Sequence, residues 1–168
     1  MMKDLKRNSK GGTEFMDGRT IELEILGEPM GKQRPRVAKI GGFARAYTPK
    51  ETVNYESMVV DAFKKSGQEP FKVGQQLRCQ ITAYFQIPKA CYRFHKKTNT
   101  TDLTLEGEKM LKGDLRPIKK PDCDNIAKII LDALNGIAFH DDSQIVTLEV
   151  YKYYSERPKV YVDIWEVE

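Results

Sequence analysis

Apolar and polar residues alternate along four segments of the chain, and this period of two predicts β-strands. In residues 20–26 (TIELEIL) and 77–87 (LRCQITAYFQI), every second side chain is apolar, so each strand should bury one face. Residues 144–154 (QIVTLEVYKYY) and 159–167 (KVYVDIWEV) also have the composition of strands. The intervening SERP, residues 155–158, predicts a hairpin that joins the last two strands.

Two other segments repeat their apolar residues with the period of an α-helix. The first follows TPKE, which we interpret as a capping box with Thr48 as the N-cap, and it should end at Gly67. The second begins at Asp124 and ends near Asn135–Gly136, a pair that suits a left-handed helix end. We therefore expect two amphipathic helices, each with one apolar face turned to the sheet.

The remaining stretches lack a clear period. Residues 27–47 are rich in Gly and Pro, which predicts a loop or an irregular hairpin. Within residues 89–119, the segments KACYRFHKK (89–97) and EGEKMLKG (106–113) predict short helices in a basic region that we expect to be mobile. The resulting order of elements predicts an α+β fold, with a small mixed β-sheet and helices packed on one face.

A chain of 168 residues is expected to form one domain. The stretch GGTEF ahead of Met16 resembles a cloning remnant before a second start, so residues 1–15 are interpreted as a tag and residues 16–168 as the domain. A native disordered arm is the alternative for residues 1–15.

Composition narrows the class of protein. No apolar run approaches the roughly 20 residues of a membrane span, and the first residues lack the apolar centre of a signal peptide. We therefore expect a soluble, cytoplasmic protein with no membrane partner. Three cysteines without a C-x-x-C pair indicate neither disulfides nor a zinc site, so packed, reduced thiols are expected.

Acidic residues gather in KPDCDNIAKIILDALNG (120–136) and FHDDSQI (139–145). In the first segment, carboxylates two apart enter the helix, and a lysine and a further aspartate follow on one helix face at steps of four residues. The second segment is a turn before a strand. If that strand begins near the helix start, its second aspartate converges on the first pair. The residues concerned are Asp122, Asp124, Lys128, Asp132, Asp141 and Asp142.

Converging carboxylates would repel one another unless a cation compensates. A hard divalent ion with oxygen ligands, Mg²⁺ or Mn²⁺ in its place, suits phosphate chemistry, and Lys128 could neutralise charge that develops on the phosphate. Plainer interpretations stay open. Asp124 could be an N-cap, Lys128 and Asp132 an ordinary helix ion pair, and Asp141–Asp142 a turn.

The acidic motif resembles the signature of the RusA family of Holliday-junction resolvases, and GEPMGKQRPR resembles that family's basic motif. The resemblance implies a homodimeric, Mg²⁺-dependent endonuclease of bacterial or phage origin that nicks four-way DNA junctions symmetrically in DNA recombination and repair. By motif position it implies Asp122, Asp124, Asp142 and Lys128 as catalytic residues, the three aspartates as metal ligands, and Asp141 and Asp132 as outer-shell or structural acids.

Basic residues supply the expected DNA contacts. Residues 29–50 hold six of them and no acid, and phosphate contacts of this kind are independent of sequence and sensitive to salt. Cys123 departs from the family pattern, and we expect it to point into the core without a catalytic role. A DNA-binding module without catalysis and a less selective metal-dependent nuclease are the alternatives. The expected phosphate contacts are Lys32, Arg34, Arg36, Arg45, Lys119 and Lys120.

Overall fold

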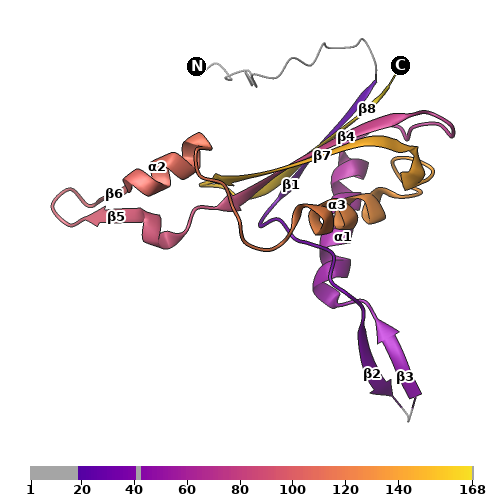
Figure 1. Ribbon diagram of the computed structural model, residues 1–168, viewed down its shortest axis with the longest axis horizontal. Coiled ribbons are helices and arrows are strands. Elements are labelled where there is room, and N and C mark those ends of the chain that lie inside the picture. The colour runs from indigo at the N-terminus through magenta and orange to yellow at the C-terminus, as the bar shows by residue number, and fades with distance from the viewer. Residues whose placement is uncertain (1–18, 41–42, 168) are drawn as a thin grey trace.

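A four-stranded sheet is the centre of the protein (Figure 1). The structure is a computed structural model that describes residues 19–40 and 43–167, so the interpretation of residues 1–15 lies outside it. The strands follow the order β1-β8-β4-β7, with β4 and β7 parallel and the other two pairs antiparallel. The expected mixed sheet is thereby confirmed. Its strands are β1 (Thr20–Leu26), β4 (Leu77–Gln86), β7 (Ile145–Ser155) and β8 (Lys159–Glu166).

The hairpin predicted at SERP is wrong. The strands β7 and β8 follow each other in sequence, but β4 lies between them and pairs with both. A central strand is enclosed on both edges, and β4 is suited to that place because five of its ten residues alternate as a fully apolar face and Thr82 is buried as well. The residues after Ser155 therefore carry the chain past β4 rather than back beside β7.

Two helices, α1 (Lys50–Ser66) and α3 (Cys123–Leu134), cover one face of the sheet, as predicted. The alternation in β1 buries Ile21, Leu23 and Ile25 and leaves the glutamates between them exposed. These strand residues form one core with the apolar stripes of both helices, including Val59 and Ile130. The core therefore fixes α3 to the sheet along its length.

The helix ends differ in detail from the predictions. The helix α1 begins at Lys50, because Pro49 is still extended (φ −56°, ψ 140°) and takes the N-cap position without a side-chain bond, so the Thr48 capping box is wrong. Gly67 ends the helix in the left-handed conformation as expected, with φ 66°. Asp122, not Asp124, occupies the N-cap position of α3, which puts Asp124 in the first turn.

Two two-stranded hairpins project from the body (Figure 1). The helix predicted over residues 89–97 is wrong, since a 3-10 turn and a strand occupy it, whereas the helix predicted over 106–113 is confirmed. A small cluster of Ile87, Cys91 and Met110 anchors this region. The elements are β2 (Arg36–Ile40), β3 (Phe43–Tyr47), η1 (Lys89–Cys91), β5 (Tyr92–His95), β6 (Thr100–Leu103) and α2 (Leu105–Lys112).

Two buried cysteines match the expectation of packed thiols, and the third does not. In the part of the chain that the structure describes, no helix is long and apolar enough to cross a membrane. All three cysteines are free, and Cys79 and Cys91 are buried. Cys123 is exposed, so its predicted orientation into the core is wrong: it is the first residue of α3, before the buried stripe begins at Ile126.

Candidate active site

The first turns of α3 present the acidic motif to solvent. Asp122 precedes the helix, Asp124 lies in its first turn, and Lys128 follows one turn later; all three are exposed. Asp122 makes no side-chain capping bond. Within the described chain, none of these three side chains takes part in an ion pair. Two carboxylates and an ammonium are therefore available for a ligand.

The segment that enters α3 is held against β7. The ammonium of Lys152 donates hydrogen bonds to the carbonyl oxygens of Lys119 at 2.6 Å and of Pro121 at 2.9 Å. Just upstream, the guanidinium of Arg116 lies 4.0 Å from the ring centre of Tyr153, a cation–π contact. These contacts fix the backbone immediately before Asp122. The sequence alone did not single out Lys152 for this role.

The segment after β1 packs against the same helix start. The backbone N–H of Lys32 donates to the carbonyl of Asn125 at 2.9 Å. A Cβ atom on Gly31 would lie 2.7 Å from the Cβ of Pro121 and 3.0 Å from that of Asn125, so the two backbones can approach this closely only with glycine at position 31. Both sides of the turn into α3 are thus braced.

Lys32 does not present its charge to open solvent. Its ammonium forms ion pairs with Asp132 of α3 at 2.8 Å and with Glu56 of α1, and the Lys32 side chain is 24% exposed. Burial lowers its pKa, but hydrogen bonds to Asp132 and Glu56 outweigh this and raise the pKa above its usual value. Asp132 therefore pairs with Lys32, and the alternative pairing of Asp132 with Lys128 is not found.

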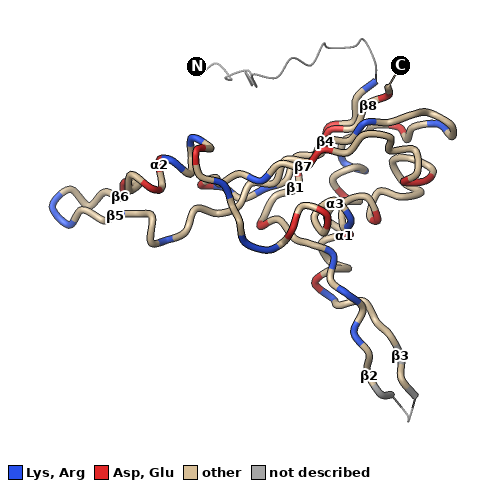
Figure 2. The backbone as a smooth tube through the Cα atoms, in the orientation of Figure 1, with Lys and Arg blue, Asp and Glu red and all other residues tan. Residues whose placement is uncertain are grey.

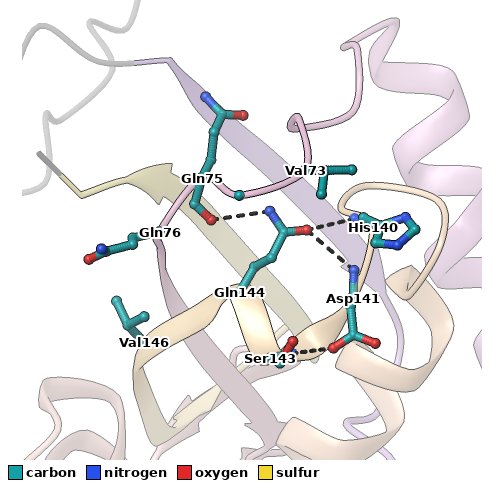
Figure 3. Close-up of a pocket in the computed structure, with 9 residues that line it drawn as sticks. Val73, Gln75, Gln76, His140, Asp141, Ser143, Gln144 and Val146 are labelled. Atoms are coloured by element: carbon teal, nitrogen blue, oxygen red, sulfur yellow. Dashed lines mark hydrogen bonds between the residues drawn. The ribbon is translucent and has the colours of Figure 1, made fainter.

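The second acidic segment forms a tight turn at η2 (Asp142–Gln144), as expected for DDSQ (Figure 3). The carboxylate of Asp141 accepts a hydrogen bond from the backbone N–H of Ser143 at 2.9 Å. Hydrogen bonding by the Ser143 side chain first, and by the Ser143 backbone second, holds the pKa of Asp141 below its usual value. The side chain of Gln144 reaches back to the backbone of His140 and Asp141. Asp142 is exposed at the start of this turn.

Asp142 does not converge on the start of α3 within one chain. The strand β7 pairs with β4 beginning at Ile145, beside the end of α3, and runs back to Lys152, which bonds to Pro121. The 12-residue helix α3 is about 18 Å long, and β7 extends about 23 Å from Ile145 to Lys152. Asp142, just before β7, is therefore separated from the start of α3 by about the length of these elements. The expected convergence is therefore wrong, because β7 begins near the helix end and not near its start.

One chain supplies only part of the carboxylate group that the sequence predicts for a metal ion. Among the described residues, no group of three or more His, Cys, Asp and Glu side chains is arranged to hold a metal ion. One chain offers Asp122 and Asp124, two exposed carboxylates of the chemistry that a hard divalent cation prefers. Carboxylate oxygens fit such an ion, but two carboxylates do not fill its coordination shell. The other ligands have to come from groups other than Asp122 and Asp124.

Exposed basic residues flank the same region. Arg34 and Arg36 lie at the base of the β2–β3 hairpin, and Lys119 and Lys120 lead into α3; all four are exposed. Figure 2 shows these basic segments on either side of the acidic helix start. Arg45 belongs to β3, and its side chain lies outside the described part. A phosphate backbone could therefore contact basic groups on both sides of Asp122 and Asp124.

Carboxylates and a lysine at a helix start, flanked by arginines and lysines, are typical of proteins that act on nucleic acid phosphates. The family model for endodeoxyribonuclease RusA matches residues 27–165. The chain therefore belongs to the RusA endodeoxyribonuclease family, and the resemblance seen in its motifs is confirmed.

Two relatives span nearly the whole chain. The uncharacterized protein YqaN of Bacillus subtilis (strain 168) is 35% identical over 147 residues, which are 88% of this chain and 96% of that protein. The crossover junction endodeoxyribonuclease rusA of Lactococcus phage r1t is 26% identical over 148 residues, which are 88% of this chain and 97% of the phage protein. The similarity thus covers both the basic and the acidic segments.

Proposed function

We propose that the protein is a metal-dependent endonuclease that resolves four-way DNA junctions by paired symmetric nicks, in DNA recombination and repair. The observation that carries the proposal is the start of α3, where Asp122, Asp124 and Lys128 are exposed and form no ion pair with any described residue, in a chain of the RusA family. The phage relative is named a crossover junction endodeoxyribonuclease, which supports the choice of branched DNA as substrate.

Each group at the helix start has a role in this proposal. Asp122 and Asp124 would hold Mg²⁺, or Mn²⁺ in its place, which would lower the pKa of a bound water and polarise the scissile phosphate. Lys128, one turn along the same helix face, neutralises charge that develops on the phosphate. Five basic residues, Arg34, Arg36, Arg45, Lys119 and Lys120, contact the DNA backbone.

A homodimer suits this substrate, because a four-way junction has two-fold symmetry and needs two nicks. The distance of Asp142 from Asp122 within one chain supports a site to which both subunits contribute, with Asp142 of one subunit acting beside Asp122 and Asp124 of the other. Asp141, which caps its own turn, and Asp132, which pairs with Lys32, serve structural roles in this proposal.

The proposal is tested with a labelled four-way junction, in Mg²⁺ and in EDTA, with the wild-type chain beside Asp124→Asn. Asp61→Asn, which removes an exposed carboxylate from α1, is the matched control. We expect paired nicks that need both Mg²⁺ and Asp124 and that persist in the control. Equal cleavage of a plain duplex would favour a less selective nuclease, and binding without nicks across metals and sequences would favour a DNA-binding module.

Mixing two inactive variants tests the shared site. Consider a heterodimer of one Asp124→Asn subunit and one Asp142→Asn subunit. If each site is built from both subunits, one of the two sites keeps all its acids, and the other site carries both changes. We therefore expect the mixture to regain nicking at one position per junction, although each variant alone is inactive. If each subunit holds a complete site of its own, every site in the mixture carries one change and no nicking returns.

A further inference from the structure

We propose that Lys32 is a positioning residue: its ammonium, held by Glu56 and Asp132, fixes the basic arm relative to the carboxylates at the start of α3. The arm is residues 34–40 and 43–47, which include the strands β2 and β3. The inference rests on the proposed function, because it explains how a phosphate bound by the arm is presented to the helix start. It gives Lys32 a role different from the phosphate contact that its place in the basic motif predicts.

The contacts of Lys32 join three separate elements at one point. Its backbone N–H bonds to the carbonyl of Asn125 in the first turn of α3, and its ammonium bonds to Asp132 of the same helix and Glu56 of α1. One residue later, the amide of Gln33 donates to the carboxylate of Glu51 near the start of α1 at 3.0 Å. The chain that leads into the arm is therefore tied to both helices.

The charges around Lys32 argue against a direct contact with DNA. Two carboxylates face one ammonium, so the group as a whole carries a negative charge. The exposed fractions of 24% for Lys32, 23% for Glu56 and 33% for Asp132 leave the ion pairs only partly screened by water. A phosphate that approached Lys32 would also approach these two acids, and their repulsion would offset the attraction.

The arm depends on this attachment for its direction. Strands β2 and β3 pair with each other and stand away from the body of the protein, beyond the start of α1 (Figure 1). A five-residue strand extends about 17 Å, so a small rotation at Lys32 becomes a displacement of several ångströms at Ile40, where β2 ends. Enzymes lose about 100-fold in rate when reacting groups are misplaced by about 1 Å.

The ion pairs of Lys32 with Glu56 and Asp132 are called the clamp. A distance measurement tests the clamp without any need for nuclease activity. Spin labels go on Cys123, which is exposed at the first residue of α3, and on Val37→Cys, which is 68% exposed in β2. Cys79 and Cys91 are buried and stay unlabelled in the folded chain. Labelled protein is diluted into unlabelled protein, so that distances between copies do not contribute to the dipolar EPR signal.

We expect a narrow distance distribution that Lys32→Met broadens or shifts. The matched control is Lys64→Met, which removes the same charge from an exposed position on α1 and should leave the distribution unchanged. Asp132→Asn removes one partner of the clamp and should broaden the distribution as well. A distribution in Lys32→Met that matches that of the unchanged chain overturns the proposal.

Junction binding and single-turnover nicking separate positioning from phosphate contact. We expect Lys32→Met to keep the dissociation constant for the junction within about threefold, with an unchanged salt slope, while nicking slows about tenfold or more. The double variant with Asp132→Asn should nick no more slowly than Lys32→Met alone, because both changes break one interaction.

Other outcomes are equally informative. A salt slope smaller by about one, with weaker binding, would make Lys32 a phosphate contact and overturn the proposal. Lys32→Arg keeps the charge and should restore most of the nicking rate, which a misfolded variant would not allow. If the unchanged chain itself does not nick junctions, the proposed function fails, and the EPR distances still decide whether Lys32 fixes the arm.

Discussion

The side-chain amide of Gln144 organises the turn that carries Asp142, and its replacement by leucine is a stringent test of the structure (Figure 3). The amide oxygen accepts from the backbone N–H groups of His140 at 2.9 Å and Asp141 at 3.3 Å. The amide nitrogen donates to the carbonyl oxygens of Lys72 at 2.8 Å and Gln75 at 3.1 Å. One side chain therefore connects the η2 turn to the loop before β4.

The expected loss follows from these four hydrogen bonds. A typical intramolecular hydrogen bond contributes about 0.5–1.5 kcal/mol net, and removal of one partner from a buried group costs more. Gln144 is only partly buried, so water can replace some of the lost bonds. We expect Gln144→Leu to lower the free energy of unfolding by about 2–3 kcal/mol, which corresponds to roughly 5–10 °C in Tm for a chain of this size.

Urea unfolding followed by far-UV circular dichroism measures this loss, and fluorescence of Trp165, the single tryptophan, checks that the transition is two-state. Gln76→Leu is the matched control, because Gln76 is exposed in the same loop and makes no side-chain hydrogen bond within the described chain. We expect the control to change the stability by less than about 0.5 kcal/mol. A loss for Gln144→Leu as small as that of the control would refute the reasoning.

Three further predictions rest on single contacts. Gly31→Ala should lower stability by about 1–3 kcal/mol in urea unfolding, because its Cβ would lie 2.7 Å from that of Pro121. A thiol reagent at pH 8 should modify Cys123 rapidly and the other two cysteines only after unfolding, as counted by released chromophore. The pKa of Glu24 is lowered, chiefly by its hydrogen bond from Lys159. Glu24 therefore adds stability above its unfolded pKa that is lost as the pH falls through the lower folded value, and Glu24→Gln should reduce this acid dependence in melting curves.

The layers of the fold could be predicted from the sequence because they depend on local patterns. Ile21, Leu23 and Ile25 are apolar at every second position, and a strand with that pattern has one face to bury. The stripe in α3 has the period of a helix and ends at a residue pair that suits a helix end. Burial of both patterns in one core requires the helices to lie on the apolar face of the sheet.

Strand order and the position of Asp142 could not be predicted in this way. The turn residues SERP suit a hairpin between β7 and β8. In the structure β4 lies between these two strands, and it is far from both of them in sequence. The direction of β7 relative to α3 then decides where Asp142 lies. No local pattern encodes that direction. Asp122 and Asp142 are therefore close in sequence but lie near opposite ends of α3.

The type of residue also did not reveal which basic side chains form contacts within the protein and which stay free for a ligand. Lys32 lies in a basic motif, yet its ammonium is engaged by two acids, while Lys152 bonds to two backbone carbonyls. A lysine ammonium is a compact charge with three donors on a flexible stem, which suits it to such contacts between segments. The arginines Arg34 and Arg36 are exposed, and in the proposed function their planar guanidinium groups contact phosphate. Two lysines thus contact the segments on either side of the acidic helix start, and the neighbouring arginines remain exposed and available for the phosphate contacts of the proposed function.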